Sequence, residues 1–258
     1  MHIYFLEDRY AQVLDHTGYM SLEGNFSEMV AIEAARICTG TEVTGDNQDI
    51  KLLKKLLELG HNTPLEHIVM RWKVKLPIFV ARQWMRHRIG TFCEKSLRYT
   101  VAERSYYVPR WNPGVDEYIK SFHRRGDYSV VDSDQNPLDE RVTHEHAEYI
   151  LQTEMSIDRY EHMLASHRWR REEIRGMLPV SMYTEFIWTV NAWSFMNWLN
   201  KRLDKHAQVE HRAYAVAGLG MFMLAFPILG QAYVEYNKLD QSSDSMIAQL
   251  LSDMERMK

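Results

Sequence analysis

The sequence predicts an α+β fold in one domain, mostly helical with a few strands. A chain of 258 residues that is 45% hydrophobic and 26% charged can bury one sizeable core. No Pro/Gly/Ser-rich linker divides it, and it carries neither a fixed-period repeat nor a low-complexity tract. One stretch alternates between apolar and basic residues, and two longer stretches carry apolar residues at helical spacing. We therefore expect residues 1–258 to form a single domain.

Residues 67–76 predict a half-buried strand. The apolar positions are Ile68, Met70, Trp72, Val74 and Leu76, and the basic ones between them are Arg71, Lys73 and Lys75. Pro77 can then occupy the first turn of a helix over residues 78–87, with Gly90 as a stop beyond it. On such a helix Gln83 and Arg86 lie on one side.

Two further local patterns flank this helix. Beyond Gly90 an extended path would place Glu94, Ser96 and Arg98 on the same side, because strand side chains repeat with period two. Upstream, Thr63 is expected to cap a helix, with a proline after it and a capping-box Glu three positions on. A helix start attracts anions, although a simple structural cap is the more common reading.

The other elements follow from periodicity and composition. Apolar stripes predict helices over residues 46–59 and 141–165. The β-branched and aromatic stretch 183–193 predicts a strand or buried turn that leads into a helix over 194–203. Polar residues 110–137 predict a surface excursion, and residues 237–258 a helical tail.

Residues 213–230 form an uncharged stretch of eighteen residues, the lower edge of what spans a membrane. Three glycines and Pro227 weaken the membrane interpretation. A buried or subunit-facing helix is therefore favoured, with no membrane partner.

The N-terminal segment and the cysteines predict a cytoplasmic protein. The segment MHIYFLEDRY carries charges where a signal peptide needs an apolar core. Cys38 and Cys93 are too few for a disulfide framework or a thiolate zinc site, and they suit a reducing compartment.

The segments HEHAE (144–148) and HAQVEH (206–211) lack the HExxH spacing, so no metal is expected.

Basic residues are concentrated in a chain whose net charge is −4. From His67 to Cys93 there are six Lys or Arg residues and no acid, so this stretch expects an anionic partner. Trp72, Phe79 and Trp84 interleave with the cations, which indicates partial burial. One alternative function is a nucleic-acid-binding module that stacks bases on Trp72 and Trp84.

Several blocks resemble the flavin-dependent thymidylate synthases. RHRIGTFCEKSLRY, with seven residues between Arg88 and Ser96, is similar to the RHR…S signature of that family. GHNTPLEH, PIFVARQWMRHR, RGMLPVSMYTEF and WTVNAWSFMNWLNKRLDKHAQVEHRAYA extend the resemblance over about 60–108 and 169–217. Separate blocks in the right order are more specific than one motif. The resemblance implies a small mixed or antiparallel sheet with long helices and a homotetramer whose sites lie at subunit interfaces.

The resemblance also implies a reaction. It is the reductive methylation of dUMP to dTMP in nucleotide biosynthesis, with methylenetetrahydrofolate as carbon donor and FAD as hydride carrier, reduced by NAD(P)H. The implied dUMP contacts are Gln83, Arg86, Glu94, Lys95, Ser96, Leu97, Arg98, Arg175 and Arg202. The implied FAD-lining positions are His61, Thr63, Arg86, His87, Arg88, Glu94, Asn191 and Asn197. No GxGxxG or GxxxxGK[ST] motif is present, so these dispersed side chains would have to grip the flavin.

The implied catalytic residue is Arg202, at the uracil ring. Methylation at C5 needs an electron-rich ring, and a permanently charged guanidinium near N3 and O4 stabilises the negative charge left when N3 loses its proton. We expect neither Cys38 nor Cys93 to act as a nucleophile on C6. Ser96 lacks an adjacent general base in sequence and fits a phosphate or loop contact better.

Three positions depart from the family pattern. Cys93 stands where Asn is common, Thr91 where Ser is usual, and Trp193 where an Arg often follows the Asn-containing turn. Trp193 could stack on a ring in place of the lost charge. These departures leave open a related enzyme that acts on another pyrimidine nucleotide or transfers a hydroxymethyl group.

Overall fold

The computed structural model describes residues 4–7, 10–13, 17–24, 26–109, 140–242 and 244–256, and the excursion predicted near 110–137 lies outside them. The chain forms two compact units. The first comprises Met1–Leu76, Val80–Glu94 and Thr184–Lys258, and the second comprises Pro77–Phe79 and Lys95–Tyr183. A single domain over the whole chain stays a prediction.

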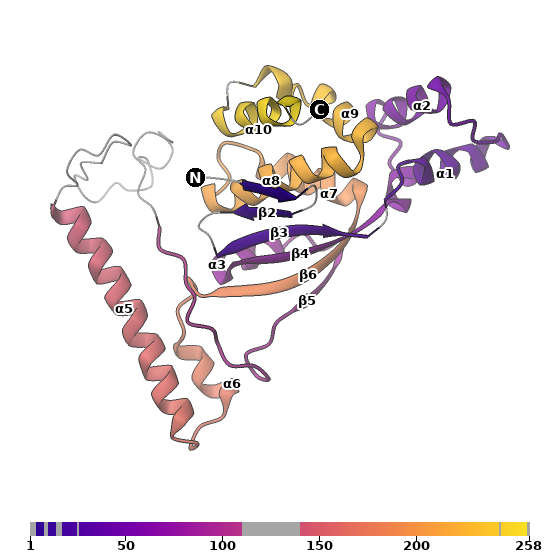
Figure 1. Ribbon diagram of the computed structural model, residues 1–258. Helices are drawn as coiled ribbons and strands as arrows, with labels where there is room; N and C mark the ends of the chain where they lie inside the picture. Colours follow the sequence, from indigo (N-terminus) through magenta and orange to yellow (C-terminus); the bar gives the residue numbers. More distant parts are fainter. Residues whose placement is uncertain are drawn as a thin grey trace. The chain divides into compact units, whose positions relative to one another are not determined.

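A six-stranded sheet is the centre of the first unit (Figure 1). Its order is β1-β2-β3-β4-β6-β5, and the pairs β1/β2, β2/β3, β3/β4 and β5/β6 are antiparallel. The strands are β1 Tyr4–Glu7, β2 Tyr10–Val13, β3 Gly18–Glu23, β4 Val69–Pro77, β5 Thr91–Glu94 and β6 Tyr183–Asn191. The α+β class and the small sheet with antiparallel pairs are therefore confirmed.

The alternation in residues 67–76 is confirmed as strand β4. Met70, Trp72, Val74 and Leu76 are all fully buried, while the basic positions between them are not. Trp72 lies opposite Leu22 of β3, so large apolar side chains gather on one face of the sheet. Strand β6 repeats this pattern, as its β-branched and aromatic residues predict.

Helices cover the buried face of this sheet. The predicted helix after β6 is α7 (Ala192–Arg202), and α8 (Val209–Ala225) packs on β2 and β3 (Figure 1). At Gly218 of α8 an added Cβ would come within 3.2–3.3 Å of Trp198, Met20 and Phe195. The absence of a side chain there lets α8 approach the sheet and α7 closely.

The uncharged stretch 213–230 is not one helix. α8 ends at Ala225, and Pro227 begins a second helix, α9 (Pro227–Tyr236), because proline suits a first helical turn but interrupts a continuing one. Residues 213–223 are buried in the first unit, as the alternative to a membrane helix predicted. Among the described residues, no helix combines the length and hydropathy needed to cross a bilayer.

The remaining helices of the first unit lie before and after this core. The predicted helix 46–59 is α2 (Asn47–Glu58), which is capped by Asp46 and follows α1 (Met29–Thr39). The tail contains the 3₁₀ turn η3 (Leu239–Gln241) and α10 (Ser245–Arg256). An apolar stripe of Ile247, Leu250 and Met254 on α10 is buried, and α10 packs on α8.

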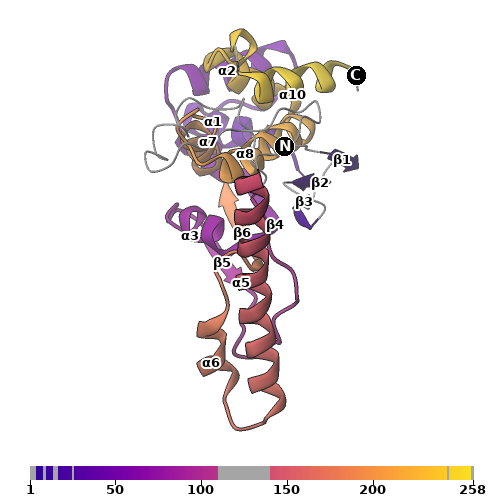
Figure 2. The ribbon, with the colours of Figure 1, turned by 90° about the vertical axis from the view of Figure 1, so that its left-hand side faces the viewer.

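The second unit is built on α5 (Glu140–Ala165), the helix predicted over 141–165. The short helix α6 (Arg171–Ile174) and the 3₁₀ turn η2 (Arg175–Met177) follow it and pack beside its C-terminal part (Figure 2). Ile157 and Tyr160 are buried, whereas Ile150 is 39% exposed. Arg104 holds the preceding segment to α5 through Glu154, Asp158 and Glu161.

Candidate active site

Helix α3 (Ile78–Trp84) carries Gln83 and is shorter than predicted. The helix was expected to reach residue 87, but the chain leaves it after Trp84, and Arg86 and Arg88 are exposed beyond its end. Gly90 accounts for the path that follows: its φ is +156°, and an added Cβ would lie 2.6 Å from Nε1 of the buried Trp188. The chain can therefore turn into β5 only with glycine at this position.

Arg202, the last residue of α7, reaches back to the end of α3. Its Nε–H donates to Nε2 of His87 at 3.1 Å, and Nη2 donates to the carbonyl oxygen of Gln83 at 3.3 Å. The Gln83 side chain in turn donates to Oε1 of Gln208. The fold thus brings together three predicted site residues: Gln83 on α3, His87 in the segment after it, and Arg202 at the end of α7.

The electrostatics of this cluster favour a neutral imidazole beside the guanidinium. Burial, followed by the charges of Arg202 and Lys201, lowers the pKa of His87 from 6.5 to about 4. His87 is therefore neutral at pH 7 and can accept the Nε–H of Arg202. Burial lowers the pKa of Arg202 as well, but the guanidinium remains charged at all ordinary pH values.

A fully buried aromatic stack fixes the two helices that meet here. Trp84 of α3 stacks on Trp198 of α7 with ring centroids 4.5 Å apart, and on His211 of α8 at 5.1 Å. Trp198 Nε1–H donates to Nε2 of His211 at 3.1 Å. Since Trp198 and Arg202 are four residues apart on α7, the stack helps to set where Arg202 emerges.

The two predicted asparagine positions lie at the start and on the exposed side of α7. Asn191 is the N-cap of the helix: its Oδ1 accepts the backbone N–H of Ser194 at 2.8 Å. Its side-chain NH₂ is the part left to contact a cofactor. Asn197 is exposed, and Trp193 between them is half-buried.

The predicted cap at Thr63 is wrong. Thr63 is the first residue of a 3₁₀ helix, η1 (Thr63–His67), and the preceding Asn62 has helical angles and makes no side-chain cap bond. With Asn62 already helical, the Thr63 side chain lies one position too late to cap the turn. His61 and Thr63 are both exposed beside it.

Glu94 ends strand β5 opposite Phe186, and its Oε1 accepts the hydroxyl of Thr184 at 2.7 Å. The predicted extended path through Ser96 and Arg98 is wrong, because the chain turns there. The carbonyl of Ser96 accepts the N–H groups of Tyr99 and Thr100, both at 3.0 Å. Ser96 and Arg98 therefore do not continue the face that carries Glu94.

The rest of the predicted nucleotide contacts belong to the second unit: Lys95, Ser96, Leu97, Arg98 and Arg175. Arg98 is exposed and forms an ion pair with Glu172 at 2.8 Å. Lys95 pairs with Glu103, and Arg175 is exposed at the start of η2. An anion could reach these exposed side chains, but at Lys95 and Arg98 it would have to replace the carboxylate that each one now pairs with.

Sequence reasoning missed Gln208 and Lys201. Gln208 fixes the side chain of Gln83, and Lys201 adds to the positive potential at His87. Gln208 lies in HAQVEH, a segment within one block of the family resemblance, but neither that resemblance nor its metal spacing assigned Gln208 a role, and its contact spans 125 positions. Lys201 directly precedes Arg202 in the last turn of α7. That position was a signal in the sequence from which its role could have been predicted.

The remaining candidate groups carry no second site within the described residues. No group of three His, Cys, Asp or Glu side chains there could hold a metal ion. Both cysteines are free and exposed, Cys38 on α1 and Cys93 on β5. The indoles of Trp72 and Trp84 are fully buried, so neither offers the stacking surface that the nucleic-acid interpretation needs.

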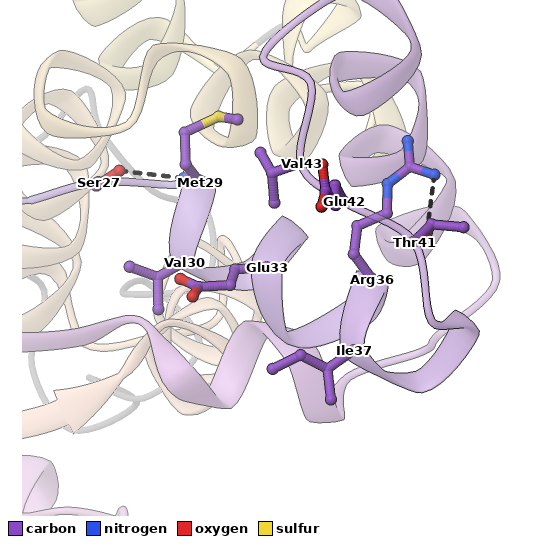
Figure 3. Close-up of a pocket in the computed structure, with 9 residues that line it drawn as sticks. All are labelled: Ser27, Met29, Val30, Glu33, Arg36, Ile37, Thr41, Glu42 and Val43. Carbon is purple, nitrogen blue, oxygen red and sulfur yellow. Dashed lines mark hydrogen bonds between the residues drawn. The ribbon is translucent and has the colours of Figure 1, made fainter.

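A cavity of about 450 Å³ lies elsewhere in the first unit, along α1 and the segment after it (Figure 3). Its lining includes the carboxylates of Glu33 and Glu42 and the side chain of Arg36. Arg36 is paired with the buried Asp49 at 2.6 Å, so the cation is already neutralised. The cavity contains none of the predicted site residues and does not suit a phosphate.

Comparison with known proteins identifies the family of this chain. The family model of the thymidylate synthase complementing protein matches residues 14–228. A flavin-dependent thymidylate synthase of Pseudothermotoga lettingae is 34% identical over 92% of this chain and 95% of its own length. One from Kosmotoga olearia is 39% identical over 80% of this chain and 85% of its own length.

Solved structures show the same fold. The crystal structure of the UMP/dUMP methylase PolB from Streptomyces cacaoi bound with 5-Br dUMP matches with a TM-score of 0.68 at 24% identity. The match covers 84% of this chain and 95% of that chain. The same methylase bound with 5-Br UMP gives a TM-score of 0.66 at 25% identity. The chain belongs to the flavin-dependent thymidylate synthase family.

Proposed function

We propose that this protein catalyses the reductive methylation of dUMP to dTMP. Methylenetetrahydrofolate would donate the carbon, and FAD, reduced by NAD(P)H, would carry the hydride. The relatives at 34% and 39% identity bear the name flavin-dependent thymidylate synthase, and the matching crystal structures are of a UMP/dUMP methylase. The arrangement of Arg202 accounts for how such chemistry can proceed.

One observation carries the proposal: Arg202 is held by neutral partners. Its two hydrogen bonds go to an uncharged imidazole and a backbone carbonyl, and within the described part of the chain it forms no ion pair with an acid. A guanidinium has five N–H groups, so three remain after these two bonds. A half-buried cation with uncommitted donors and an undiminished charge suits a ligand that develops negative charge.

The donor set also suits a flavin dinucleotide. Arg86 and Arg88 are exposed cations that can bind the diphosphate, and Thr63 and His61 are exposed hydrogen-bonding groups beside a short helix. The side-chain NH₂ of Asn191 remains available after its oxygen caps α7. When bound, reduced FAD supplies the hydride that completes the methyl group.

The protein residues would bind and polarise the pyrimidine nucleotide. Arg98 and Arg175 are the proposed partners of the 5′-phosphate, the usual role of a guanidinium towards an oxyanion, with the phosphate replacing Glu172 at Arg98. Arg202 would stabilise the negative charge on N3 and O4 as N3 loses its proton, which enriches C5 in electrons. His87 would hold the guanidinium orientation without competing for its charge, because it stays neutral.

Covalent activation by a cysteine is not needed in this scheme. Cys38 lies on α1, and Cys93 is an exposed residue of β5. Charge stabilisation by Arg202 takes the place of nucleophilic attack on C6.

We further propose that the enzyme works as a cytoplasmic homotetramer with its sites at subunit interfaces. The proposal rests on the resemblance in sequence and on the two free, exposed thiols, which suit a reducing compartment.

A second candidate is methylation of UMP as well as dUMP. The matching crystal structures are of a methylase named for both nucleotides, and Thr91, Cys93 and Trp193 depart from the family pattern. The two candidates differ only in whether a 2′-hydroxyl is accepted.

Purified protein tests the proposal directly. We expect it to be yellow, with flavin absorbance, and to convert dUMP to dTMP when methylenetetrahydrofolate and NAD(P)H are supplied. UMP and hydroxymethylated products are assayed in the same reactions. A colourless protein that yields no methylated pyrimidine, and whose binding to single-stranded nucleic acid falls steeply with salt, would overturn it.

A further inference from the structure

The first turn of α8 contacts the surroundings of Arg202 at three points. Gln208, just before α8, accepts a hydrogen bond at Oε1 from the side-chain NH₂ of Gln83. His211 accepts the indole N–H of Trp198 at Nε2. The third point is Arg212, whose Nε donates to the carbonyl oxygen of Leu203 at 3.3 Å. Leu203 is the C-cap of α7 and directly follows Arg202. This turn therefore contacts residues that surround the proposed catalytic residue: Gln83, Trp198 and Leu203.

Arg212 binds the backbone carbonyl at the C-terminal end of α7. The last carbonyl groups of a helix accept no hydrogen bond from an N–H group of the same helix. A cation beside them is favoured by the helix dipole. Arg212 is only 5% exposed, so its charge is buried at this helix end. A buried cation persists only when a counter-charge accompanies it.

Asp244, in the C-terminal tail, supplies that counter-charge. Its Oδ2 pairs with Nη2 of Arg212, and its Oδ1 accepts the N–H groups of Met246 and Ile247 at 3.0 and 3.3 Å. One carboxylate thus caps α10 and neutralises Arg212. The buried apolar stripe of α10 holds the tail on α8 independently of this charge.

We infer that Asp244 and Arg212 are positioning residues, which fix the C-terminal end of α7 so that Arg202 stays against His87 and Gln83. The inference rests on the proposed function in assigning Arg202 to the nucleotide. It gives the tail a role in the site, although the family match ends at residue 228. Without the carboxylate, Arg212 would lose this counter-charge, and its bond to the Leu203 carbonyl at the end of α7 would weaken.

The test is Asp244→Ser, which separates the two roles of the carboxylate. A serine Oγ still caps a helix, but it removes the counter-charge from Arg212. The kcat for tritium release from C5-labelled dUMP should fall by about tenfold to a hundredfold, because small misplacements of a catalytic group have effects of this size. Asp244→Glu should restore part of the rate, and Asp240→Ser, at an exposed tail position, should match the wild type.

A second readout needs no substrate. The full-length protein labelled with ¹³C in its twelve histidine rings is titrated by NMR, and His87 is identified by the signal missing from His87→Gln. The pKa of His87 should rise in Asp244→Ser, towards 6.5 from about 4, as Arg202 moves away. The rise should be partial, because burial is the largest cause of the low pKa, and the charged groups that face His87 besides Arg202 include Lys201.

The outcomes separate this inference from the proposed function. A lower kcat with a raised His87 pKa, and an unchanged Asp240→Ser control, supports it. A lower kcat with an unmoved His87 pKa and a lower melting temperature overturns it, as does a variant that behaves like the wild type in both assays. If the wild type makes no dTMP but the His87 pKa rises in Asp244→Ser, the positioning stands and the proposed function fails.

Discussion

Arg202 donates its Nε–H to Nε2 of His87 at 3.1 Å, across 115 positions of the sequence. Two side chains that usually carry or acquire positive charge thus meet without repulsion, because burial keeps the imidazole neutral. The contact fixes one edge of the guanidinium and leaves its charge uncompensated by any described acid. This relationship links the fold of α3 and α7 to the proposed chemistry.

His87 predicts a pH dependence of folding stability. The pKa of its imidazole is about 4 in the folded protein, against 6.5 when unperturbed. Between these values the unfolded chain binds a proton that the folded chain does not, so the free energy of unfolding falls as the pH drops from 6.5 to about 4. Below that pH this group causes no further loss.

His87→Gln should remove this part of the pH dependence. Urea unfolding of both proteins at pH 7 and pH 4.5 measures it, and we expect a difference on the order of 1 kcal/mol after solvent screening. His162→Gln, at an exposed position of α5, is the control and should follow the wild-type curve. If the free energy of unfolding changed equally between the two pH values in His87→Gln and the wild type, the imidazole would not be buried as described.

Arg98 should contribute to nucleotide affinity. Replacing it with alanine would remove the proposed charge-assisted bond to the phosphate, so the Kd for dUMP should rise about tenfold or more. Titration of the flavin spectrum with dUMP measures the change. Arg168→Ala, which removes an exposed arginine of the same unit, should leave the Kd unaltered. An unchanged Kd in Arg98→Ala would exclude this residue from the site.

The two thiols should be dispensable for turnover. Cys93→Ser keeps the size and exposure of the side chain but removes the more nucleophilic sulfur, and Cys38→Ser does the same on α1. We expect kcat for dTMP formation close to the wild-type value in both variants and in the double variant. Loss of turnover in Cys93→Ser with the flavin still bound would point instead to attack by a cysteine on the pyrimidine.

Elements with regular local patterns could be predicted from the sequence. Strand β4 follows from strict alternation over residues 67–76, and α2 follows from its apolar stripe. The errors fall where tertiary contacts decide. The turn at Ser96 replaced an expected strand, and a 3₁₀ helix replaced the expected cap at Thr63.

The site was predictable only as a set of residues. The family resemblance named Gln83, His87 and Arg202, but their contact depends on how α3 packs against α7. That packing is set by the Trp84–Trp198 stack, whose members are far apart in sequence. The links from Gln208 and Arg212 carry no short motif, so only the fold reveals them.

The catalytic role of Arg202 is the central claim, and Arg202→Ala tests it. Flavin absorbance should be retained because no predicted flavin position is replaced and only His87 among them loses a bond. Tritium release from C5-labelled dUMP should fall at least about a hundredfold, as when a single charge-stabilising donor is removed. Lys205→Ala, an exposed neighbour beyond α7, should release tritium at the wild-type rate. Near-normal tritium release from Arg202→Ala with flavin bound would contradict the claim.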